Sequence, residues 1–141
     1  MDMLNLLKAM SGAGASDLII SADAKPQMRV NGMLVSLNDQ IVSRELAADL
    51  GMSLISDDQR EALKVKRSLE FSYDNEDKTR FRVSVYYQRD SLATAIRLIP
   101  SKIPSFMELG LPDIVHDFAN EPHGLVLITG PAGSGKSTTL A

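Results

Sequence analysis

The sequence predicts an α+β fold for residues 1–99, with a mostly antiparallel sheet and flanking helices, followed by a linker and the start of an α/β domain. Two observations support this prediction. Three consecutive segments between residues 68 and 99 alternate apolar and polar side chains, as half-buried antiparallel strands do. Earlier segments instead repeat their apolar residues every three or four positions, which is the helical period.

The composition indicates a globular protein with a substantial core. Of the 141 residues, 44% are hydrophobic and 23% are charged. The net charge of −3 argues against a nucleic-acid-binding protein, which would normally be basic. The absence of cysteine excludes disulfides and cysteine-ligated zinc, and it fits a cytoplasmic protein. Because no apolar run reaches the roughly 18 residues of a membrane span, we expect no direct membrane insertion.

Local signals predict three helices before residue 68. The first has apolar residues at helical spacing between Met3 and Met10. The second opens on Ser43, a good N-cap residue. The third begins with acidic and ends with basic residues, which suits the helix macrodipole. The predicted helices span residues 2–11, 43–55 and 57–67.

Two groups of strands are predicted around these helices. The first comprises a buried strand, Asp17–Ser21, and a hairpin whose turn, Asn31-Gly32, suits positive φ angles. That hairpin covers Gln27–Leu37. The second group comprises the three alternating strands, which are Ser68–Asp74, Thr79–Tyr87 and Ser91–Ile99.

A boundary between two domains is predicted at "PSKIPS", Pro100–Ser105, where two prolines bracket polar residues. Residues 100–122 would form the linker and short helices, with Phe106–Asn120 helical apart from an interruption near Gly110–Pro112. Residues 123–141 would begin the second domain with a strand, Leu125–Thr129. We expect that this strand forms no ordered sheet in the present chain, because its partner strands would lie further along.

The sequence after that strand matches the phosphate-loop pattern G-x-x-x-x-G-K-[ST]. Glycines let several backbone N–H groups converge on phosphate oxygens, and the start of a helix adds its positive dipole end. Lys136 would reach the β- and γ-phosphates of ATP as the catalytic lysine, and the Ser137 hydroxyl would coordinate Mg²⁺. The predicted nucleotide-binding residues are Gly130, Pro131, Ala132, Gly133, Ser134, Gly135, Lys136, Ser137 and Thr138.

A phosphate-loop enzyme also needs an acidic residue on a second strand and a group that orients water. These would lie beyond Ser137, after which only four residues follow. We therefore expect the 141-residue chain by itself to hydrolyse no ATP.

Strand register predicts a pair of facing arginines. If the last two strands pair symmetrically through Gln88–Ser91, their apolar faces coincide and Arg82 lies opposite Arg97. Facing like charges destabilise a sheet, so the pair favours a bound anion such as phosphate. Alternatively, pairing Phe71 with Phe81 would set Glu70 beside Arg82 as an ordinary surface ion pair. Both interpretations stay open here, and Arg80 is a third candidate on the same face.

Several longer stretches resemble one family. "GASDLIIS", "MRVNG", "RFRVSVYYQ", "IRLIPSKIPS", "ELGLP" and "GLVLITGPAGSGKSTTLA" are similar, in order and spacing, to secretion-type ATPases, above all the type IV pilus retraction ATPases of the PilT/PilU type. The resemblance extends from about Gly14 to Ala141. It implies a PAS-like domain in residues 1–99 and the incomplete start of a RecA-like ATPase domain in residues 123–141.

The same resemblance implies function and partners. The intact protein would be a homo-hexamer that closes over ATP and Mg²⁺, with Arg82, Arg97 and Arg80 brought onto the phosphates. It would act on an inner-membrane pilus platform protein from the cytoplasmic face of that membrane, without binding nucleic acid. The catalytic acidic residues of the family would lie beyond Ala141.

Two positions depart from the family pattern, and other functions compete. Ile19 stands where a histidine is common, as in PilU-like variants, and Ala132 stands where threonine is common. The start of the chain just before the shared part favours retraction over pilus extension or type II secretion. Further alternatives are a non-catalytic domain that contacts other protomers and an unrelated phosphate-loop kinase.

Overall fold

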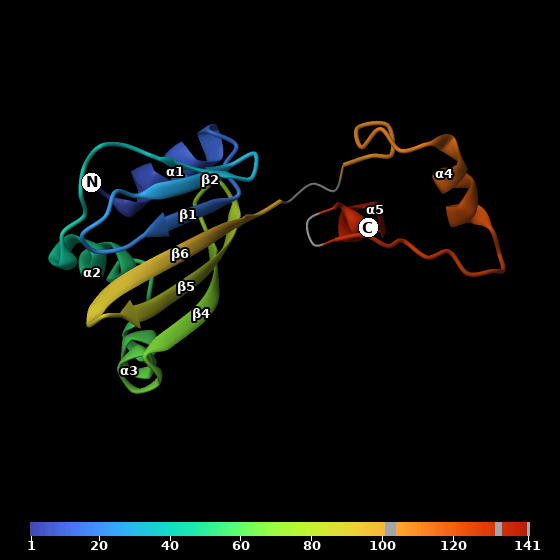
Figure 1. The fold of residues 1–141 in the computed structure, drawn as a ribbon. Helices are drawn as coiled ribbons and strands as arrows, with labels where there is room; N and C mark the ends of the chain where they lie inside the picture. The colour runs from blue at the N-terminus through green and yellow to red at the C-terminus, as the bar shows by residue number, and fades with distance from the viewer. Residues whose placement is uncertain (101–103, 132–133, 141) are drawn as a thin grey trace. The chain divides into compact units, whose positions relative to one another are not determined.

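The computed structural model describes residues 1–100, 104–131 and 134–140, and the chain divides into two compact units, Met1–Pro100 and Ser101–Ala141 (Figure 1). Unit 1 contains one six-stranded sheet in the order β3-β2-β1-β6-β5-β4, in which every neighbouring pair is antiparallel. The predicted antiparallel α+β fold of this part is thus confirmed. The strands are β1 Asp17–Ile20, β2 Gln27–Val30, β3 Met33–Ser36, β4 Ser68–Asp74, β5 Arg80–Gln88 and β6 Ser91–Ile99.

Both two-residue hairpin turns have left-handed backbone at their two central residues. Asn31 and Gly32, between β2 and β3, have φ angles of 50° and 83°, as predicted for this turn. Arg89 and Asp90, between β5 and β6, have φ angles of 48° and 61°. The second turn fixes the symmetric pairing of the two long strands, in which Gln88 faces Ser91.

The register of β5 against β6 is confirmed, whereas that of β4 against β5 was predicted wrongly. Val83 faces Ile96 as expected, but Phe71 faces Val83 rather than Phe81. The shift arises in the loop after Asp74, which closes with hydrogen bonds from Asn75 N to Thr79 O and from Lys78 N to Asn75 O. Because Asp74 faces Arg80, the loop contains Asn75–Thr79, which is two residues more than the pairing of Phe71 with Phe81 would leave. Lys78 within this loop has a left-handed backbone.

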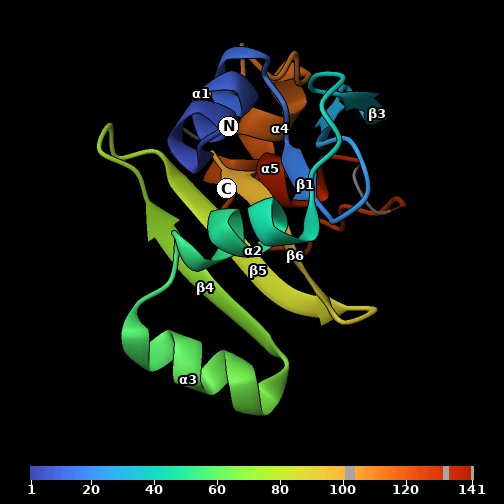
Figure 2. The ribbon, with the colours of Figure 1, turned by 90° about the vertical axis from the view of Figure 1, so that its left-hand side faces the viewer.

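Three helices accompany the sheet, and each begins at a side-chain cap. They are α1 Met3–Gly12, α2 Arg44–Met52 and α3 Asp57–Lys66. Asp2, Ser43 and Ser56 accept hydrogen bonds from backbone N–H groups in the first turns of these helices. The second helix was predicted to extend to Ile55, but α2 ends at Met52. Figure 2 shows α1 and α2 lying against the strands.

One face of the sheet forms the core, and the other is polar and open. On β5, Phe81, Val83 and Val85 are fully buried, while the intervening Arg82 is exposed. The same alternation on β6 buries Ile96 and exposes Arg97. Because successive strand residues point to opposite faces, burial of the apolar set forces the arginines onto the open face.

Helix α2 approaches β6 closely at one glycine. A Cβ atom at Gly51 would lie 2.8 Å from the Thr94 hydroxyl oxygen and 2.9 Å from Leu92 Cδ2. Both distances are shorter than ordinary carbon contacts. The Thr94 hydroxyl is itself buried and has no hydrogen-bond partner among the described residues. Glycine at this position therefore sets how near the helix packs to the sheet.

Unit 2 contains α4 Asp113–Asn120 and α5 Lys136–Leu140 among its described residues. The predicted interruption near Gly110–Pro112 is present, since α4 begins at Asp113 after Pro112, which occupies the N-cap position with an extended backbone. The part predicted before the interruption, from Phe106, forms turns rather than an α-helix. The predicted strand Leu125–Thr129 is not formed, and Leu125 and Leu127 are largely exposed. Unit 2 offers this segment no partner strand among its described residues, as the sequence had led us to expect.

Residues 101–103 of the predicted linker lie outside the described residues. In the ranges that the structure describes, no helix is long and apolar enough to cross a bilayer.

We expect Gly51→Ala to destabilise unit 1. The clash with Thr94 and Leu92 should cost about 1–3 kcal/mol of overpacking, partly offset by roughly 1 kcal/mol of better helix propensity. Thermal unfolding measures the difference. Gly12→Ala is the matched control, since a Cβ there meets nothing within 4 Å, and it should leave the midpoint unchanged or higher. Equal midpoints for the two variants would contradict the close approach.

Candidate nucleotide-binding site

The described part of the phosphate loop folds around its lysine. Lys136 Nζ donates hydrogen bonds to the backbone oxygens of Gly130, at 2.9 Å, and Pro131, at 2.6 Å. These bonds hold the ammonium group against the start of the loop, although Lys136 itself begins α5 at the loop's other end. The arrangement brings the single cation of the motif close to its backbone.

Two loop positions require glycine. Gly130 has a φ angle of 155° and Gly135 one of 89°, which side chains with a Cβ rarely adopt. A Cβ at Gly130 would also lie 2.7 Å from the Ser134 hydroxyl oxygen. These two residues therefore occupy conformations that explain the glycines of the motif. Ala132 and Gly133, which the sequence also assigned to nucleotide binding, lie outside the described residues.

The first turn of α5 carries the hydroxyl predicted to bind Mg²⁺. Ser137 and Thr138 are exposed there, and the turn closes with a bond from Thr139 N to Gly135 O at 2.9 Å. The residues that the structure describes contain no cluster of three His, Cys, Asp or Glu side chains suited to a metal ion. The exposed Ser137 hydroxyl would suit Mg²⁺ as one oxygen ligand, and the other ligands would have to come from phosphate and water.

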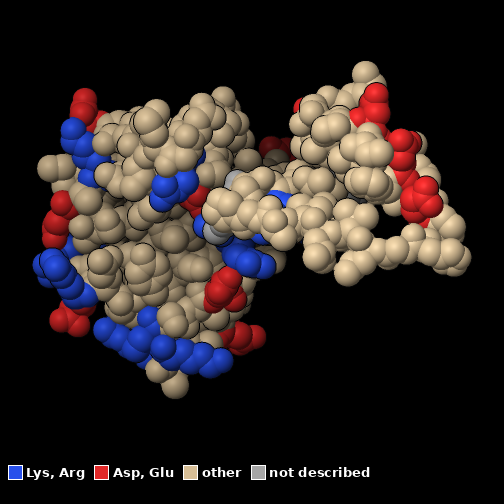
Figure 3. Space-filling view, turned by 45° about the vertical axis from the view of Figure 1, so that its right-hand side comes forward, with Lys and Arg blue, Asp and Glu red and all other residues tan. Residues whose placement is uncertain are grey.

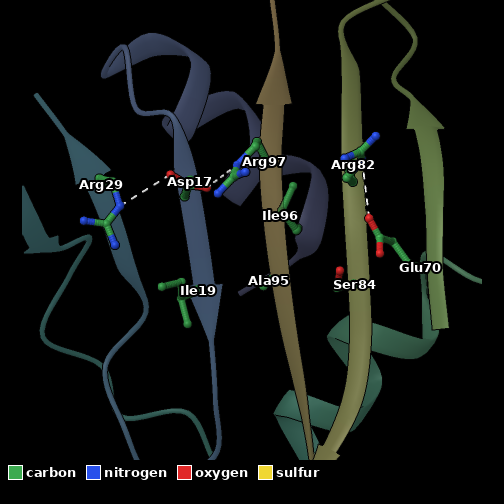
Figure 4. Close-up of a pocket in the computed structure, with 9 residues that line it drawn as sticks. All are labelled: Asp17, Ile19, Arg29, Glu70, Arg82, Ser84, Ala95, Ile96 and Arg97. Atoms are coloured by element: carbon green, nitrogen blue, oxygen red, sulfur yellow. Dashed lines mark hydrogen bonds and ion pairs between the residues drawn. The ribbon is translucent and has the colours of Figure 1, made fainter. Parts of the chain in front are cut away.

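In unit 1, the predicted arginine pair is present on the open face of the sheet (Figure 4). Arg82 on β5 lies directly opposite Arg97 on β6. The row continues through β1 and β2, because Asp17 faces Arg97 on one side and Arg29 on the other. Three arginines and one aspartate thus follow one another across four adjacent strands.

Asp17 and Arg29 are the two residues of this row that the sequence analysis missed. Arg97 Nε donates to Asp17 Oδ1 at 2.8 Å, and Ser16 Oγ donates to Oδ2, also at 2.8 Å. Arg29 Nε lies 3.5 Å from Oδ2, and Arg29 Nη1 donates to Gly32 O. Only 16% of the Asp17 side chain is exposed. A prediction of strand order, which places β1 beside β6, would have found this contact.

The contacts of Asp17 determine its charge. Partial burial raises the pKa of this carboxyl, but the hydrogen bonds from Arg97 and Ser16 and the charges of Arg97 and Arg29 outweigh burial. The pKa therefore lies below its ordinary value of 3.8. Asp17 is a carboxylate at neutral pH and offsets part of the positive charge of the row.

The other two candidate contacts are exposed ion pairs. Arg82 Nε lies 3.4 Å from Glu70 Oε1, so the predicted pair exists although the register behind it was wrong. Arg80 Nε donates to Asp74 Oδ1 at 3.0 Å. All four side chains are more than half exposed, and such pairs contribute about 0–1 kcal/mol each. Both arginines keep further N–H donors for another ligand.

The arginine pair borders a shallow hollow of about 330 Å³ in the open face. Small side chains, Ser84 and Ala95, lie on β5 and β6 beside the arginines (Figure 4). On the face of unit 1 that Figure 3 shows, positive and negative residues are interspersed. On this face, attraction for an anion would thus depend on the hollow rather than on a broad basic surface. Arg80 does not line it.

Comparison with known proteins defines the family. Residues 67–141, more than half of the chain, match the family model "Type II/IV secretion system protein". The chain belongs to this family. Over 141 residues it is 37% identical to the type IV pilus retraction ATPase PilT and 35% identical to the type IV pilus ATPase PilU, both of Pseudomonas aeruginosa.

A solved structure of another member has the same fold. The crystal structure of the pilus retraction motor PilT with bound ADP matches 99% of this chain with a TM-score of 0.79 and 38% sequence identity. The chain spans only part of these secretion system proteins: 41% of the length of PilT and 37% of PilU from P. aeruginosa, and 41% of the solved PilT chain.

The lowered pKa of Asp17 predicts a pH dependence of stability. The folded state holds this proton less tightly than the unfolded state, so the contribution is complete above about pH 3.8 and is lost as pH falls through the lower, folded-state pKa. Acid unfolding of Asp17→Asn should therefore show a shallower loss of stability in this window than the parent chain. Asp39→Asn, which removes the exposed Lys25–Asp39 pair, is the control and should follow the parent profile. Identical profiles for Asp17→Asn and the parent would contradict the prediction.

Proposed function

We propose that this chain is the N-terminal part of a hexameric ATPase that powers type IV pilus retraction. The observation that carries the proposal is the 37% identity to PilT along the whole chain, together with a complete phosphate-loop motif. The ADP named with the solved PilT structure supports nucleotide binding. In this proposal unit 1 is the PAS-like domain, and unit 2 begins the RecA-like ATPase domain.

The proposed site combines both units' residues in the assembled protein. The backbone of Gly130–Thr138 surrounds the phosphates, Lys136 exchanges its two carbonyl partners for β- and γ-phosphate oxygens, and Ser137 holds Mg²⁺. Arg82 and Arg97, with Arg80 beside them, contact the phosphates through donors that their carboxylate partners leave free.

The proposed motor acts at the cytoplasmic face of the inner membrane on a pilus platform protein. Its similarity to PilU is nearly as high as its similarity to PilT, which favours the PilU role as a second candidate. Complementation separates the two: the full-length gene should restore twitching motility to a strain lacking PilT, whereas a PilU-type protein should restore only a strain lacking PilU.

Lys136→Ala in the full-length protein should abolish ATP turnover, because the motif's only cation at the phosphates is removed. Nucleotide titration and phosphate release measure binding and turnover. Lys25→Ala, which breaks only the exposed pair with Asp39, is the control and should leave both unchanged. Full turnover by the Lys136 variant would exclude a phosphate-loop ATPase.

Arg97→Ala in the full-length protein should weaken ATP binding about 10- to 100-fold, the effect of losing a hydrogen bond from a charged group. The same titration measures it, with Lys25→Ala as the reference. Unchanged affinity and turnover would exclude the arginines from the proposed nucleotide site, whereas the assignment of the phosphate loop would stand.

We expect no magnesium-dependent ATP hydrolysis by the 141-residue chain alone. It lacks, in this proposal, the second-strand acidic residue and the water-orienting group that the remainder of the protein supplies. A sensitive phosphate-release assay on the purified chain checks this, with the full-length protein as the positive control. Turnover that survives in the chain but vanishes in its Lys136→Ala variant would contradict the expectation.

A further inference from the structure

Two carboxylates flank the facing arginines from their outer sides. Arg97 is bound to Asp17 on β1, and Arg82 is paired with Glu70 on β4 (Figure 4). Facing cations on neighbouring strands repel each other. The two acids thus draw the guanidinium groups toward opposite sides of the hollow that lies along β5 and β6.

The two carboxylates differ in how firmly they are held. Glu70 is 61% exposed, and its contact with Arg82 is 3.4 Å long. Asp17 is only 16% exposed and receives a 2.8 Å hydrogen bond on each of its oxygens. An exposed pair leaves both side chains free to move. Asp17 is half-buried and bonded on both oxygens, so it holds the Nε end of Arg97 in one place, although the rest of the Arg97 side chain is exposed.

The contacts of Asp17 continue through Arg29 to a tight turn. On the side of Asp17 away from Arg97, Arg29 is anchored by its own bond of 3.0 Å to Gly32 O, in the tight turn between β2 and β3. The bond from Arg97 uses Nε, so the terminal amino groups of its guanidinium keep their donors. Arg97 is therefore oriented while most of its hydrogen-bonding capacity stays available.

We propose that Asp17 is a positioning residue, which holds the Arg97 guanidinium in a fixed orientation for a polyphosphate at the edge of the hollow. Asp17 itself contacts no phosphate. This inference rests on the proposed function, because the polyphosphate is the ATP of that site. Holding Arg97 in place before binding removes the cost of ordering a long, flexible side chain.

The charge of Asp17 and its positioning role predict opposite effects of Asp17→Asn on ATP binding. Removing a carboxylate near a site for a polyanion should tighten binding if the carboxylate acts only through its charge. If Asp17 orients Arg97, Asp17→Asn should instead weaken ATP binding to the full-length protein, by about three- to tenfold. Glu70→Gln makes the same charge change at an exposed, loosely held position and should leave affinity unchanged or raise it up to about fivefold.

A double-mutant cycle separates positioning from a general effect on structure. Once Arg97 is replaced by alanine, Asp17 has nothing to orient, so adding Asp17→Asn to Arg97→Ala should weaken ATP binding no further. Titration with ATP at equilibrium supplies all four affinities. Independent, multiplicative losses would overturn the proposal, and so would tighter binding by Asp17→Asn alone.

A milder variant covers the case in which Asp17→Asn does not fold. Ser16→Ala removes the hydrogen bond to Asp17 Oδ2 and leaves every charge in the row unchanged. It should weaken ATP binding by about two- to threefold, and only when Arg97 is present. No change of affinity in Ser16→Ala, with Asp17→Asn unfolded, would count against the proposal.

These experiments separate a failure of the positioning role of Asp17 from a failure of the proposed ATPase function. If Lys136→Ala abolishes ATP binding and Arg97→Ala weakens it, but Asp17→Asn does not, the nucleotide site stands and the positioning role fails. If Lys136→Ala binds ATP normally, the proposed function itself fails and the positioning role fails with it.

Discussion

The rest of unit 1 depends on the pairing of its two longest strands, β5 and β6. A tight turn with two left-handed residues sets this register, and burial of one face makes it unique, since a slip by one residue would place Phe81 and Val83 in water. Once the apolar side chains are committed to the core, Arg82 and Arg97 have no other place than opposite each other on the open face. The repulsive pair is thus a direct result of how the core is built.

That repulsion explains the surrounding charges. An arginine pair with no counter-ions would weaken the centre of the sheet, and strands added on either side supply a carboxylate to each partner. The contribution on the β1 side is the stronger one, because Asp17 is partly buried and bonded by two side chains. The open face therefore carries positive charge that the sheet tolerates and that an anion can still reach.

Local signals in the sequence were sufficient for most of the elements of unit 1. Alternation, caps and the Asn31-Gly32 turn each involve neighbouring residues, and the corresponding strands and helices are present. The failures concern information that is not local. The loop after Asp74 has a conformation that its composition did not specify, and this shifted the pairing of β4. Asp17 and Arg97 are 80 residues apart, so their contact follows only from strand order. The phosphate loop was recognised from its motif, whereas the strand before it needs partners that unit 2 does not provide among its described residues.

If the phosphate loop binds nucleotide as proposed, the contacts of Lys136 affect which anions it accepts. Its ammonium group already donates to two backbone carbonyls, so a ligand must offer more than those neutral oxygens to replace them. Carbonyl dipoles compete well with water or a single weak acceptor, but poorly with several adjacent negative oxygens. The internal bonds would therefore act as a threshold, which favours polyphosphates over monoanions before any contact with the base or sugar is made.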